Sequence, residues 1–65
     1  MRADSATIEL EALRARARAI MNQATTTMND GGRLLDAGQL PQAQKRLREA
    51  AELLEDAAQL VAKGG

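Results

Sequence analysis

The chain has 65 residues, enough for one small domain, and its nine basic and nine acidic residues cancel. It contains no Cys, His, Trp, Tyr or Phe. These absences remove disulfides, thiolate and imidazole metal ligands, His-activated nucleophiles and aromatic stacking on bases. Of its 29 apolar residues, 14 are Ala, so the core that the chain can build alone is thin. The composition is typical of a helical element that packs against another protein.

Apolar and small residues recur at intervals of three and four in the first half of the chain. This periodicity predicts a helix over residues 5–37. Asp4 and Ser5 are suitable N-cap residues ahead of it. A second apolar row with strict seven-residue spacing runs beside the first and consists of Met21, Met28 and Leu35.

The Asn-Asp-Gly-Gly segment at 29–32 could bend or break this helix, because each Gly costs roughly 1 kcal/mol relative to Ala. The apolar phase nevertheless continues to Leu34, which favours one continuous helix over a break. Gly31 lies on the apolar stripe, where the missing Cβ would let another backbone come close.

The predicted reversal of the chain comes at residues 38–40. Gly38 suits the position just after a helix, and Pro41 suits the first turn of the next one. A second helix is predicted over residues 41–62, ending at Lys63 and the glycines that follow. The sequence therefore predicts an all-α fold, an antiparallel two-helix hairpin forming a single domain over residues 1–65.

The second helix carries Leu40, Leu47, Leu54 and Val61 at seven-residue spacing, with Ala43, Ala50 and Ala57 three residues after the first three of them. This stripe of alternating Leu and Ala predicts the seam against the first helix, which offers its own small residues there. The apolar face is wider than one seam needs. Because the second helix is shorter, we also expect Ile8, Leu10 and Leu13 to project beyond its end.

Surplus apolar surface indicates a protein-binding function. The candidate interface residues are Ile8, Leu10, Leu13, Ala17, Ile20, Met21, Met28, Leu53 and Leu60. A helical protein is the expected partner, and we expect the chain to self-associate into a homo-oligomer when it is alone.

Residues that suggest chemistry have simpler interpretations as solvated helix surface. Arg14 and Arg18 share a side of the helix while Arg16 points nearly opposite, so no continuous basic stripe for nucleic acid forms. Glu52, Glu55 and Asp56 lack the opposing ligands that a metal site needs. We therefore expect no enzyme, no catalytic residue, no metal, no cofactor, no nucleic-acid partner and no membrane insertion. Without a targeting signal, the expected location is the cytoplasm.

The segment from Arg33 to Val61 resembles the small co-chaperones of the type III secretion needle subunit. The matching features are Leu34-Leu35 ahead of Gly38, Pro41 opening the next helix, the Leu47 and Leu53-Leu54 pattern, and Leu60-Val61 near the end. The resemblance implies a bacterial cytoplasmic hairpin with a role in protein transport and virulence. Such a hairpin stabilises a tetratricopeptide-repeat chaperone, and that chaperone keeps the needle subunit unpolymerised. The chain departs from the family pattern in lacking aromatic residues and in carrying Gly31-Gly32.

Two alternatives stay open. The hairpin could pair with itself into a four-helix bundle that acts as a small RNA- or DNA-linked regulator, or it could be a purely structural coiled coil.

Overall fold

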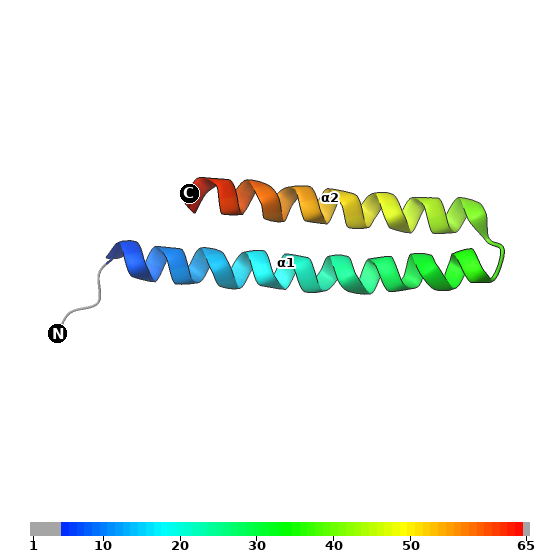
Figure 1. Ribbon diagram of the computed structural model, residues 1–65, viewed down its shortest axis with the longest axis horizontal. Helices are drawn as coiled ribbons and strands as arrows, with labels where there is room; N and C mark the ends of the chain where they lie inside the picture. The colour runs from blue at the N-terminus through cyan, green and yellow to red at the C-terminus, as the bar shows by residue number, and fades with distance from the viewer. Residues whose placement is uncertain (1–4, 65) are drawn as a thin grey trace.

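The computed structural model describes residues 5–64, and all but three of these lie in two helices. Helix α1 spans Ser5–Asp36 and helix α2 spans Leu40–Gly64. The helices run antiparallel and side by side (Figure 1). The predicted all-α hairpin is therefore confirmed, with α2 beginning one residue earlier and ending two residues later than expected. The predicted cap at Asp4 lies outside the described residues.

Helix α1 runs without a break through Gly31 and Gly32, which confirms the continuous helix favoured by the apolar phase. The hydroxyl groups of the preceding threonines stay hydrogen-bonded inside the same helix. Each donates to the carbonyl oxygen four residues earlier, with Oγ1 to O distances of 3.0, 3.2 and 2.9 Å for Thr25, Thr26 and Thr27. These bonds satisfy the three hydroxyl groups within the helix, in a stretch where β-branched residues lower helix propensity.

The turn is closed by a Schellman arrangement around Gly38, which has a φ of 78°. The Gly38 amide donates to the Leu35 carbonyl at 3.0 Å, and the Gln39 amide donates to the Leu34 carbonyl at 2.9 Å. Both carbonyls would otherwise lack partners at the helix end. The Ala43 amide then donates to the Gln39 carbonyl at 3.0 Å, which starts α2. Gly38 thus takes the predicted position after the first helix.

Small residues form the seam between the helices. Every buried residue of the described chain is Ala or Gly, and each helix contributes three at seven-residue spacing: Ala17, Ala24 and Gly31 from α1, and Ala43, Ala50 and Ala57 from α2. A Cβ built on Gly31 would lie 3.6 Å from the Ala43 backbone oxygen and 3.1 Å from Leu47 Cδ2. The close approach predicted at Gly31 is therefore present.

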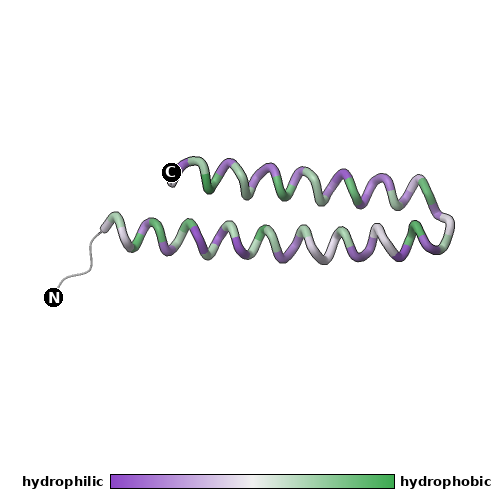
Figure 2. Tube along the Cα trace, in the orientation of Figure 1, coloured by the Kyte–Doolittle hydropathy of each residue, from purple (hydrophilic) through white to green (hydrophobic). Residues whose placement is uncertain are grey.

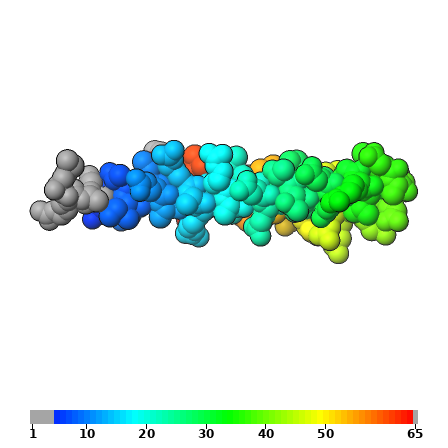
Figure 3. All heavy atoms as spheres, turned by 90° about the horizontal axis from the view of Figure 1, so that it is seen from below, coloured from blue at the N-terminus to red at the C-terminus, as the bar shows by residue number. Residues whose placement is uncertain are grey.

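A small-residue seam brings the two helices close and leaves larger side chains on the two sides of the pair. Hydrophobic residues recur about once per turn along both helices (Figure 2). The Cα trace extends 57 × 18 × 10 Å, and the described residues form a long, narrow rod (Figure 3). The chain exposes 5229 Å², whereas a compact monomer of 6.9 kDa would expose about 4,000 Å². The two helices therefore form one layer, and both faces of the helix pair are exposed to solvent in the part of the chain that the structure describes.

Candidate protein-interaction surface

One face of the layer, here called the open face, carries seven large apolar side chains that are 42 to 59% exposed. Six of them lie four residues after a buried seam residue, and the seventh, Leu40, lies three residues before Ala43 on the same side of α2. In two antiparallel helices that pack together, residues offset in the same sense from the seam project to the same side of the pair. The open face consists of Met21, Met28 and Leu35 on α1, and Leu40, Leu47, Leu54 and Val61 on α2.

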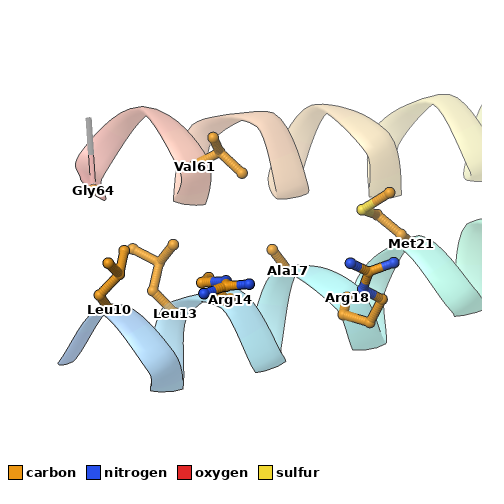
Figure 4. A pocket seen from close by; sticks show the side chains of 8 residues that line it. All are labelled: Leu10, Leu13, Arg14, Ala17, Arg18, Met21, Val61 and Gly64. Carbon is orange, nitrogen blue, oxygen red and sulfur yellow. The ribbon is translucent and has the colours of Figure 1, made fainter. Parts of the chain in front are cut away.

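A groove at the end of the hairpin away from the turn shows this arrangement directly. Met21 of α1 and Val61 of α2 line it together (Figure 4). Arg14 and Arg18 also line it, while Arg16 does not. Two cations therefore lie at one end of the open face, and no third arginine extends them into a basic stripe.

Small residues continue the open face along the outer side of α2. Ala51 and Ala58 are exposed beside Leu47 and Leu54, with Gln44 at the third position of that column. Arg18, Thr25 and Gly32 occupy the corresponding column of α1. On α2, charges appear at the next column, where Arg48 and Glu55 are exposed. The open face is thus mainly apolar, with Arg14 and Arg18 at the end away from the turn and Arg48 and Glu55 along its α2 edge.

The opposite face of the layer is better covered. Its large side chains are half-buried, and they comprise Leu13, Ile20 and Leu34 on α1 with Leu53 and Leu60 on α2. Charged pairs flank it near the turn. Arg46 Nη1 donates to Glu49 Oε2 at 2.9 Å, and Arg33 Nη2 donates to Asp30 Oδ1. These exposed pairs contribute little stability, but they mark a face with a polar edge.

The candidate interface residues from the sequence fall into different environments. Met21 and Met28 lie on the open face, and Ile8 is 54% exposed near the start of α1. Ala17 is 4% exposed, so its side chain is used within the seam. Ile20, Leu53 and Leu60 are half-buried on the opposite face.

The expectation that Leu10 and Leu13 project beyond the second helix is wrong. A Cβ built on Gly64 would lie 3.4 Å from Leu13 Cδ1 and 3.7 Å from Leu10 Cδ1. Helix α2 reaches these residues because it continues to Gly64, which takes the small position seven residues after Ala57. Leu13 is half-buried and Leu10 is 45% exposed as a result.

The sequence pattern did not predict the apolar column of α2 as an interface, because the stripe of alternating Leu and Ala also fits the seam between the helices. In the structure the seam takes only the alanines of the stripe, and Leu40, Leu47, Leu54 and Val61 remain 42 to 59% exposed. The signal was present in the matched columns of small residues. Because both helices carry Ala or Gly at every seventh residue, these small residues fill the seam. A Leu three residues before each buried Ala of α2 then lies to one side of the seam.

The described residues hold no group of three His, Cys, Asp or Glu side chains placed to bind a metal ion. Within the same part of the chain, neither helix combines the length and the apolar character required to cross a membrane. Comparison with protein-family models, curated proteins and solved structures finds no match to this chain.

Proposed function

We propose that this hairpin is a non-enzymatic protein-interaction module that binds an amphipathic helical surface through its open face. The observation that carries the proposal is the seven large apolar side chains, each 42 to 59% exposed, on one side of a layer whose own core is Ala and Gly. A core of that kind buries too little area to offset the entropy of ordering some sixty residues. Covering the open face supplies the missing apolar burial.

The resemblance in layout identifies the partner to test first, a cytoplasmic tetratricopeptide-repeat chaperone of the type III secretion needle subunit. Repeat proteins of this kind present concave helical surfaces, and an apolar helix pair fits such a surface as a helix-in-groove ligand. In this role the hairpin would stabilise the chaperone without contacting the needle subunit. The open face is mainly apolar between Arg14 and Arg18 at one end and Arg48 and Glu55 along its α2 edge, which supports protein rather than polyanion binding.

The test is affinity capture with variants that change the open face but preserve the helix. Leu54→Asp places a carboxylate at its centre, and Leu40→Asp places one at its edge. Residue 40 is in the first turn of α2, where a negative charge favours the helix. Burying an unpaired carboxylate costs several kcal/mol, so Leu54→Asp should weaken binding more than about 100-fold.

Gln42→Asp is the matched control, because it adds the same charge to the same turn of α2 at an exposed position off the open face. We expect a helical protein, identified by mass spectrometry, to bind wild type and Gln42→Asp but not Leu54→Asp, and to bind Leu40→Asp more weakly than its matched control Gln42→Asp. Circular dichroism checks that helix is retained. Retention of nucleic acid alone, or protein binding that is unaffected by Leu54→Asp, would contradict the proposal.

A further inference from the structure

The open face of α2 is complementary to itself. Its large column, Leu47, Leu54 and Val61, lies beside a second column in which Ala51 and Ala58 are small and Gln44 is polar. If α2 packs antiparallel on a second copy of α2, a two-fold axis between residues 52 and 53 sets the large column of one copy against the second column of the other. Leu54 then faces Ala51 of the second copy, Leu47 faces its Ala58, and Val61 faces its Gln44. Large-to-small pairing of this kind lets two helices pack closely.

The charges on the outer edge of α2 select the same register. With the two-fold axis between residues 52 and 53, Arg48 of one copy lies nearest Glu55 of the other, and the pair occurs twice. If the two α2 helices slide by seven residues relative to each other, Arg48 instead lies nearest its own symmetry mate. Edge charges set register and orientation in coiled coils in this way, and only the first register avoids a like-charge contact.

The area of the open face is sufficient for such a pairing. Seven large side chains that are about half exposed, together with Ala51 and Ala58, present on the order of 500 Å² of apolar surface per chain. Two copies together bury about 1,000 Å², the size at which specific interfaces begin. The flexible side chains of Met21 and Met28 fill the space between the two copies of α1.

We propose that the free chain forms a symmetric antiparallel dimer, a four-helix bundle with α2 packed on α2 around Ala51 and with Arg48 paired to Glu55 of the second copy. The proposal rests on the proposed role of the open face as an interaction surface, and it names a second copy as the occupant in the absence of another partner. The turns of the two hairpins lie at opposite ends of the bundle.

Introduced cysteines test the geometry, because the natural chain has none. At 1.5 Å per residue, the two copies of residue 51 are offset along the axis by about 4–5 Å, whereas the two copies of residue 58 are offset by about 16 Å. Ala51→Cys should therefore form a disulfide-linked dimer under mild oxidation, and the matched variant Ala58→Cys should not. A monomeric Ala51→Cys chain, or equal cross-linking of both variants, would overturn the proposal.

Charge reversal tests the register without cysteine. Arg48→Glu and Glu55→Arg each create two like-charge contacts and should dimerise at least 10-fold more weakly than wild type. An equimolar mixture restores both opposite-charge pairs, so the heterodimer should outcompete either homodimer in native mass spectrometry. If the charge-reversal variants dimerise as tightly as wild type, the proposed register is wrong. If the chain never dimerises but captures a protein that Leu54→Asp no longer binds, the dimer is rejected and the proposed function stands. If Ala51→Cys cross-links as a dimer but the chain captures no protein, the dimer stands and the proposed function is rejected.

Discussion

Gly38 has a left-handed backbone conformation with a φ of 78°. This conformation lets the amides of Gly38 and Gln39 donate hydrogen bonds to carbonyl oxygens at the end of α1. A Cβ there meets no atom within 4 Å, so the cost of a side chain is conformational rather than steric. We expect Gly38→Ala to lower the free energy of unfolding by about 1–2 kcal/mol. Urea unfolding at fixed protein concentration measures it. Unchanged stability would show that the turn can reverse the chain with another backbone geometry.

The adjacent glycines Gly31 and Gly32 differ in what a side chain would meet. Nothing lies within 4 Å of a Cβ built on Gly32, whereas one on Gly31 would lie 3.1 Å from Leu47 Cδ2 and 3.2 Å from its Cγ. Gly32→Ala should therefore gain about 0.5–1 kcal/mol of helix stability. Gly31→Ala should gain less, because Leu47 must move. Thermal unfolding of the two variants compares them, and equal stabilisation would contradict the close contact at Gly31.

At the scale of the helices, the seam depends on the size of its residues. Ala24 is fully buried and Ala50 is 2% exposed, so a larger side chain has no space between the helices. Ala24→Leu should destabilise the hairpin by about 1–3 kcal/mol. Ala12→Leu, at an exposed position of the same helix, is the control and should change stability by less than about 0.5 kcal/mol. If chemical denaturation shows both variants equally stable, the seam is not closely packed.

The hairpin could be predicted from the sequence because its determinants are local. Gly38 and Pro41 mark the turn, and the apolar phase crosses Gly31 without a shift. The assignment of side chains to faces could not be made with the same accuracy. It depends on how closely the helix axes approach, and the alternating Leu and Ala of α2 fit a wide seam or a narrow one equally well.

The end of α2 shows a second limit of local signals. Lys63 and the glycines after it are typical of a helix end, yet α2 includes Gly64. Gly64 lies near Leu13, because a Cβ built on it would be 3.4 Å from Leu13 Cδ1, and this neighbour is distant in the sequence. These two extra residues bring the end of α2 alongside Leu10 and Leu13, which the prediction placed beyond it.

At the scale of the whole molecule, the core consists of small residues and the open face is mainly apolar. The free energy of unfolding therefore depends on whether a second copy or another protein covers the open face. A chain that folds fully only when the face is buried gains stability with concentration by mass action. Leu54→Asp should remove this gain, because its carboxylate opposes burial of the face.

The concentration dependence of folding tests this account most directly. Circular dichroism melts of wild type and Leu54→Asp over about a hundredfold range of concentration, with sedimentation equilibrium at the same concentrations, would show it. We expect the wild-type Tm to rise with concentration as the chain passes from monomer to dimer, and the Leu54→Asp chain to stay monomeric with a lower, constant Tm. A wild-type chain that remains a fully helical monomer, with one Tm at every concentration, would contradict the account.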